Sequence, residues 1–92
     1  MNKKECYNKV YTDVLWCLKN NLQETKIYDD DLKERFFTLK EFFNKDFNFF
    51  KNFFIYFPYN FFSYRLALRE LNDNDLKKMI KDLKKELLGD KK

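Results

Sequence analysis

The two cysteines are the most reactive side chains in this chain, and both are predicted to be structural. Cys6 and Cys17 fall on the apolar side of a segment with helical spacing, and the 92 residues include no histidine to act as a base. Two thiolates without histidine also cannot complete the four nitrogen and sulfur ligands of a structural zinc site. Eleven residues of helix separate the two Cα atoms by about 16 Å, well beyond the roughly 7 Å that a disulfide spans. We therefore expect two buried free thiols.

The rest of the composition narrows the chemistry further. Asp29, Asp30 and Asp31 form the densest acidic group, but an acidic run is also typical of the first turn of a helix. The glycine and the distal glutamate of a calcium-binding loop are missing from this region. One glycine, Gly89, cannot build a glycine-rich phosphate loop. We therefore predict a protein that is not an enzyme and that has no metal site and no cofactor.

One helical face in the segment 61–71 is a stronger candidate for function. Spacings of three, four and seven residues bring together Phe62, Arg65, Leu66 and Arg69. Two of the chain's three arginines belong to this group, and arginine beside aromatic groups is typical of residues that dominate protein–protein binding. The alternative is that Phe62 and Leu66 pack on another helix while the arginine stems lie along apolar surface.

Two further apolar residues, Phe37 and Ile55, are candidates for the same partner-binding role. Each is expected on the polar side of its helix, where a single exposed apolar side chain would mean little. Together with Phe62 and Leu66 they indicate more apolar surface than one small core can bury. Such an excess favours binding to another protein, or a homodimer or larger homo-oligomer.

The segment 75–88 carries a second candidate surface, which is basic. Its lysines are Lys77, Lys78, Lys81, Lys84 and Lys85. The chain has a net charge of +4, and all of the excess lies in residues 47–92, where ten basic side chains face six acidic ones. A nucleic-acid-binding protein would use such a stripe to contact phosphates. Against this, Asp82 and Glu86 lie among the lysines, and a lysine-rich composition is also what an AT-rich coding sequence produces.

Hydrophobic periodicity predicts the helices that hold these surfaces. Apolar residues recur at helical spacing in five segments, namely 3–22, 31–44, 47–57, 61–71 and 75–88. The residues expected to cap the five N-termini are Asn2, Asp31, Asp46, Asn60 and Asn74. Twelve phenylalanines supply the large side chains that so short a chain needs for a core. We predict an all-α fold, a compact single-domain bundle of about five short helices.

Residues 47–57, with the sequence FNFFKNFFIYF, are expected to form the central helix of this bundle. Phenylalanine and tyrosine also favour strands, but Asn48, Lys51 and Asn52 draw one polar stripe only on a helix. If the preceding helix continued through Asp46, that carboxylate would enter the apolar stripe, so a break at 44–46 is expected. Pro58 should end the Phe-rich helix.

The leading functional hypothesis is a non-enzymatic protein-binding module that regulates or inhibits a larger protein machine. Small size, AT-rich coding bias and the lack of catalytic residues are typical of inhibitors that phages and mobile elements direct against host defence, including anti-CRISPR proteins. The alternatives are a nucleic-acid-binding protein and a homo-oligomeric structural protein. No early apolar run is long enough for a secretory signal, and no stretch reaches the roughly 20 apolar residues of a membrane span. We therefore expect a cytoplasmic protein without membrane association.

Overall fold

The first helix begins at a reciprocal cap, as the sequence predicts. In the computed structural model, which describes residues 2–20, 27–28, 34–35, 37–57 and 62–89, helix α1 is Lys3–Asn20. The Asn2 side chain accepts a hydrogen bond from the Glu5 backbone at 2.8 Å, and the Glu5 carboxylate accepts one from the Asn2 backbone at 3.0 Å. Two N–H groups that the helix itself leaves unpaired are thereby satisfied.

Four further helices follow in the described part of the chain. They are α2 (Leu39–Phe43), α3 (Phe47–Tyr56), α4 (Phe62–Arg69) and α5 (Asp73–Leu88). A two-residue antiparallel pairing of β1 (Ile27–Tyr28) with β2 (Glu34–Arg35) precedes α2. The Cα radius of gyration is 12.6 Å, against about 12 Å expected for a compact chain of this length. The predicted all-α, compact bundle of five helices is therefore confirmed.

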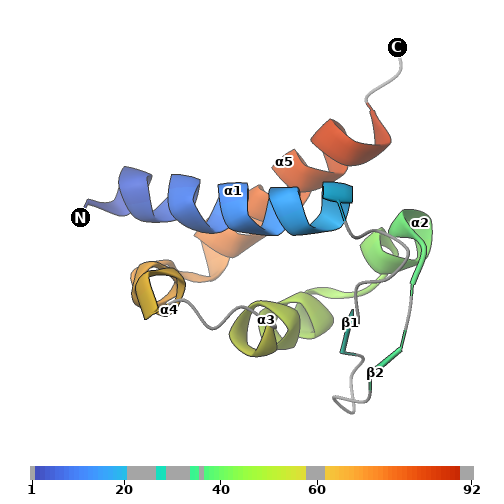
Figure 1. Cartoon of the computed structure of the whole chain (residues 1–92), viewed down its shortest axis with the longest axis horizontal. Coiled ribbons are helices and arrows are strands. Elements are labelled where there is room, and N and C mark those ends of the chain that lie inside the picture. Colours follow the sequence, from blue (N-terminus) through green and yellow to red (C-terminus); the bar gives the residue numbers. More distant parts are fainter. Residues whose placement is uncertain (1, 21–26, 29–33, 36, 58–61, 90–92) are drawn as a thin grey trace.

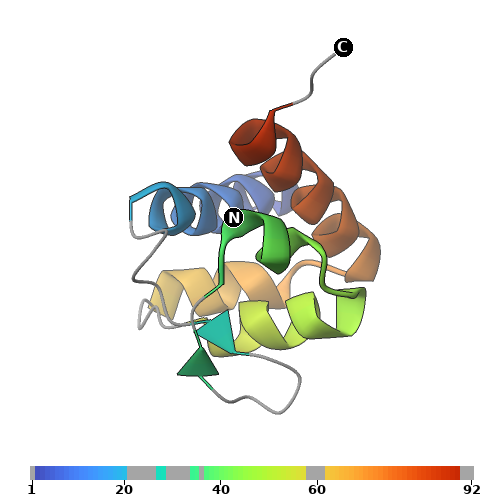
Figure 2. The same ribbon diagram turned by 90° about the vertical axis from the view of Figure 1, so that its right-hand side faces the viewer.

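The helices are arranged so that α4 and α3 lie side by side beneath α1, with α5 crossing behind α1 (Figure 1). In the view turned by 90°, α2 lies in front, with α3 below it, α5 to its right and the β pairing near the same end of the molecule (Figure 2). Helix α4 packs chiefly on α1, and it also contacts α3. The outer side of α4 is therefore held at a fixed place on the surface, next to the C-terminal end of α3.

The predicted break between the second and third helices is confirmed. Asp46 caps α3, with its side chain accepting a hydrogen bond from the Phe49 backbone at 2.9 Å. A short side-chain acceptor at this position satisfies an orphan helix donor and keeps the carboxylate at the helix end, outside the core. The Phe-rich segment that follows is a helix, as its polar stripe indicates, and not a strand.

The second helix is shorter than predicted, and the expectation of one helix over 31–44 was wrong. Glu34 and Arg35 are extended and pair with β1, and α2 begins only after Thr38. Thr38 and Glu41 form a capping box, with backbone-to-side-chain hydrogen bonds of 3.0 and 3.1 Å. This cap starts the helix, because the extended Thr38 backbone cannot continue a helix from the residues before it.

The last helix begins two residues earlier than predicted and is capped by Asn72 instead of Asn74. The Asn72 side chain accepts from the Asp75 backbone at 2.9 Å, and the Asp75 carboxylate accepts from the Asn72 backbone at 3.0 Å. Asn72 is favoured because its acidic partner stands at the third helical position. Gly89 ends the helix at a φ of 78°, and its N–H donates to the Lys85 carbonyl.

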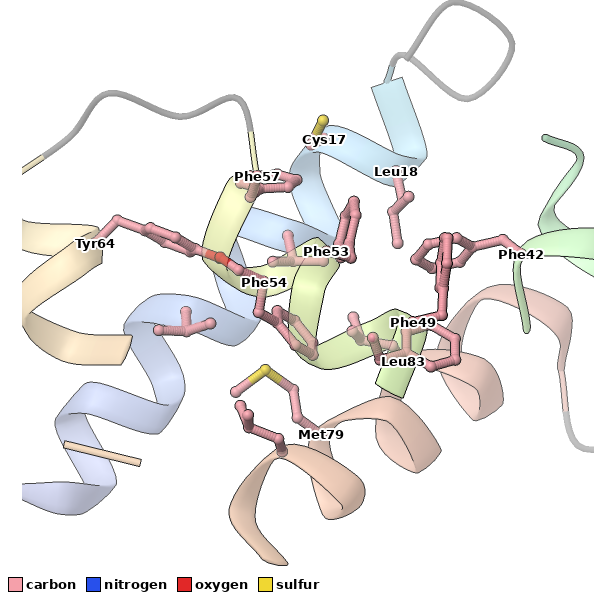
Figure 3. Close-up of a cluster of buried hydrophobic side chains, with 14 of the residues drawn as sticks. Cys17, Leu18, Phe42, Phe49, Phe53, Phe54, Phe57, Tyr64, Met79 and Leu83 are labelled. Atoms are coloured by element: carbon pink, nitrogen blue, oxygen red, sulfur yellow. The ribbon is translucent and has the colours of Figure 1, made fainter. Parts of the chain in front are cut away.

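The core is built mainly from aromatic rings that meet edge to face (Figure 3). Phe42 of α2 lies at its centre, with its ring centroid 5.0 Å from each of Phe43, Phe50 and Phe53. The Tyr64 hydroxyl reaches from α4 to donate to the Phe54 carbonyl of α3 at 3.1 Å. Edge-to-face pairs add about 0.5–1.5 kcal/mol each beyond the area they bury, so this cluster joins α2, α3 and α4.

The two cysteines are buried and neither forms a disulfide, as predicted. Other sequence predictions lie outside the described residues: the helical end at 21–22, the acidic helix start at 29–31, the helix stop at Pro58 and the cap at Asn60. Within the described ranges, no helix is both long and apolar enough to cross a lipid bilayer.

Candidate protein-binding site

The outer side of α4 presents apolar side chains to solvent, as the sequence predicts. Phe62 is 76% exposed and Leu66 is 40% exposed, so neither is covered by another helix of the described chain. Arg65 and Arg69 are also exposed on this side. These four residues are the α4 face, and the alternative in which Phe62 and Leu66 pack inside the bundle is wrong.

A pocket of about 350 Å³ lies beside the α4 face, between α3, α4 and the start of α5. Its apolar lining is Phe54, Leu68, Leu71 and Leu76. Its polar lining comes from Lys51, Arg65, Arg69 and Asp73, and Ile55 completes it. Three predicted partner-binding residues, Ile55, Arg65 and Arg69, are therefore brought to one concave site.

The charged side chains of this pocket differ in whether they have a partner within the chain. Arg65 donates through Nη1 to the Ile55 carbonyl at 3.5 Å, near the C-terminal end of α3, where the helix dipole favours a cation. Lys51 is ion-paired with Asp73 at 3.5 Å, which links α3 to α5. The Arg69 side chain makes no hydrogen bond or ion pair with any residue in the described ranges. One guanidinium is thus positioned and the other is available to a ligand.

Phe37 does not belong to this surface, and its predicted exposure was wrong. The side chain is only 4% exposed, and its ring meets that of Phe49 edge to face at 5.8 Å. Lys45 Nζ lies 4.8 Å from the centre of the Phe37 ring. The helical wheel placed Phe37 outside because it assumed a helix through this position, whereas α2 begins after Thr38.

Sequence reasoning missed several residues at or near candidate surfaces. Lys51 and Asp73 were not predicted as site residues, because their proximity depends on how α3 packs against α5. Trp16 and Tyr56 are about half exposed, and Leu88 is also exposed. Of these residues, Trp16 could have been noticed in the sequence, because it is the single tryptophan of the chain.

The lysines of α5 are all exposed, and they fall into two groups. Lys77 Nζ lies 5.0 Å from the Phe47 ring centre, and Lys78 lies over Tyr7 and pairs with Asp82 at 3.1 Å. Lys81, Lys84 and Lys85 line a hollow near the end of the helix. The predicted stripe is therefore divided into two lysines that lie over aromatic rings and a group of three at the hollow.

Two acidic residues of α5, Asp75 and Asp82, contact α1. Asp75 is ion-paired with Lys3 at 3.0 Å, and Asp82 accepts a hydrogen bond from the Tyr7 hydroxyl at 2.5 Å. The Tyr7 hydrogen bond is the main cause that lowers the pKa of Asp82 below its ordinary value. Burial and the same hydrogen bond raise the pKa of Tyr7. The pair therefore links α1 to α5 in its protonated-tyrosine, ionised-aspartate form.

This pair predicts a loss of stability in acid. Because the folded-state pKa of Asp82 lies below the ordinary value of 3.8, its contribution is present above that pH and lost as the pH falls below it. Tyr7→Phe should lower the free energy of unfolding by about 1 kcal/mol at neutral pH and reduce the further loss in acid. Urea denaturation of both proteins at about pH 7 and about pH 3 measures the difference. An equal acid loss in the two proteins would contradict the assignment.

Comparison of the chain with protein-family models, curated proteins and solved structures finds no match in any of the three. The functional proposal below therefore depends on the geometry of the α4 face and its pocket.

Proposed function

We propose that this protein is a non-enzymatic binding module that regulates or inhibits a larger protein by docking on it through the α4 face. The observation that carries the proposal is the exposure of Phe62 beside Leu66. Phe62 is 76% exposed, so a partner that covers it removes a large apolar surface from water. Complete burial of such a side chain is favourable by about 1.5–3 kcal/mol. Arg65 and Arg69 follow Phe62 on the same side of α4 and can supply the directional contacts typical of binding hot spots.

The partner can be identified by cross-linking from the surface itself. A photoactivatable phenylalanine analogue at position 62 should cross-link one discrete protein in the cells that produce this chain. The same analogue at Thr12, which is exposed on α1, is the matched control and should not cross-link that protein. Equal products from both positions would indicate non-specific contact and contradict the proposed surface.

The double variant Phe62→Ala with Arg65→Glu should weaken binding to the purified partner by about thirtyfold or more, since it removes one apolar and one charged anchor. Isothermal calorimetry measures the dissociation constants, and thermal unfolding establishes that the variant is folded. A folded double variant that binds with the wild-type constant would remove the α4 face from the proposal. Cross-links to a second copy, with a dimer mass by light scattering, would instead favour the homo-oligomeric alternative.

The second candidate function is nucleic-acid binding by α5. It is favoured by the hollow that the exposed Lys81, Lys84 and Lys85 line near the C-terminal end of the helix. A gel shift with DNA or RNA that weakens steeply as salt rises would support this candidate. The α4 face remains the leading site, because phosphate binding by the lysines of α5 would not explain why Phe62 is exposed on α4.

A further inference from the structure

We propose that the pocket between α3 and α4 receives an acidic side chain, together with a neighbouring aliphatic one, from the docked protein partner. This inference rests on the proposed function and adds the chemistry of what is recognised. The ligand is thus a short peptide segment of the partner in which aspartate or glutamate stands next to leucine, isoleucine, valine or methionine.

The size and lining of the pocket fit side chains better than a large ligand. A volume of about 350 Å³ is at the lower end of the roughly 300–1,000 Å³ of small-molecule sites, so it accommodates one or two side chains. Ile55, Leu68 and Leu71 keep accessible apolar surface that an aliphatic side chain can cover. A bare phosphate would leave this apolar lining without a contact, which favours a peptide over a nucleic-acid backbone.

The charge of the rim selects for a carboxylate. Lys51, Arg65 and Arg69 bring three positive charges and Asp73 brings one negative charge, which leaves a net of +2 at the pocket. The Asp73 carboxylate is ion-paired with Lys51 and not with Arg65 or Arg69. A guanidinium offers two parallel N–H donors in the geometry that a carboxylate accepts.

Arg69 is the principal anchor in this arrangement. It lies one helical turn beyond Arg65, so both guanidinium groups lie along the pocket on the same side of α4. The Arg65 side chain already donates to the Ile55 carbonyl, whereas the Arg69 side chain forms no hydrogen bond or ion pair within the described ranges. A carboxylate entering the pocket would therefore satisfy Arg69 without breaking a contact of the folded chain.

The pocket is also continuous with the α4 face. Arg65 and Arg69 belong to both, and Phe62 and Leu66 lie on the adjoining turns of the same helix. A segment that covers Phe62 with apolar groups can therefore place an acidic side chain in the pocket. This continuity is why the partner's contact segment should combine apolar and acidic residues.

Selection from a library of random linear peptides tests the proposal without knowledge of the partner. The whole chain is immobilised as wild type, as Arg69→Gln and as Lys4→Gln, which removes the same charge from an exposed position of α1. Peptides enriched on the wild type should combine an acidic residue with aliphatic neighbours. A synthetic copy of an enriched peptide should bind Arg69→Gln about tenfold more weakly and Lys4→Gln within about twofold of wild type. Amide chemical shifts should change at Ile55, Arg65 and Leu68.

The outcomes separate this inference from the proposed function. Enriched peptides without acidic residues, or equal binding to the wild type and Arg69→Gln, would overturn the carboxylate pocket. If such peptides still lose affinity for Phe62→Ala, the docking role of the α4 face stands alone. If no peptide is enriched, or an oligonucleotide binds with the same dependence on Arg69, the inference also fails, while cross-linking from position 62 still tests the proposed function.

Discussion

Replacing Phe42 with alanine is expected to lower the free energy of unfolding by about 3–5 kcal/mol, the usual cost of removing a buried phenylalanine. Phe42 is 1% exposed, and its ring contacts those of Phe43, Phe49, Phe50 and Phe53 at 5.0–5.8 Å. The variant therefore loses the free energy gained by burying the ring and several aromatic contacts, and it leaves a cavity in the centre of the core. A domain of this length is stable by roughly 5–14 kcal/mol, so the variant should approach the limit of folding.

Phe62→Ala is the matched control, because it makes the same chemical change at a side chain that is 76% exposed. It should shift the unfolding free energy by less than about 0.5 kcal/mol. Urea denaturation of the two variants, followed by circular dichroism, measures both values. If Phe42→Ala were as stable as Phe62→Ala, the aromatic cluster would not be the centre of the core.

The Phe-rich helix could be predicted from the sequence because its polar residues are as informative as its apolar ones. Asn48, Lys51 and Asn52 fall on one stripe only at a helical period, and Asp46 marks the cap. The structure confirms α3 at Phe47–Tyr56. Local signals of this kind are sufficient where the cap, the stripe and the apolar face agree.

The segment before α2 could not be predicted in this way. The spacing of Phe36, Leu39 and Phe43 is helical, but a competing signal was present in Thr38 and Glu41, which form a capping box inside the predicted helix. Glu34 and Arg35 pair with Tyr28 and Ile27, which lie six and eight residues earlier, and a helical wheel drawn on one segment does not include such a pairing. The misplacement of Phe37 followed from this single error.

The α4 face could be predicted and its pocket could not. The exposure of Phe62 and Leu66 follows from the burial of Tyr64 and Ala67 on the opposite side of one helix, which is a property of the local sequence. The pocket requires α3 and the start of α5 to lie beside α4, and Lys51 and Asp73 enter it only through that packing. The spacing of apolar residues predicts which side of a helix is exposed, whereas a pocket depends on how several helices pack together.

Ala67→Asp should destabilise the protein by several kcal/mol at neutral pH, because it places a charge on the buried side of α4. Ala67 is completely buried, and α4 packs mainly on α1. The introduced carboxylate would have to lose its hydration there, or α4 would have to move away from α1. The second route would also displace Arg65 and Arg69, so partner binding should weaken together with stability.

The pH dependence of Ala67→Asp distinguishes a buried charge from a simple steric clash. Burial raises the folded-state pKa of such a carboxyl above its unfolded value of about 3.9, so the penalty is complete at neutral pH and shrinks as the acid becomes protonated. Comparison with wild type at about pH 7 and about pH 4.5 by urea denaturation should give the larger difference at the higher pH. Ser63→Asp, on an exposed position of the same helix, should change stability little at either pH. A penalty for Ala67→Asp that does not vary with pH would mean that volume, and not charge, limits the contact between α1 and α4.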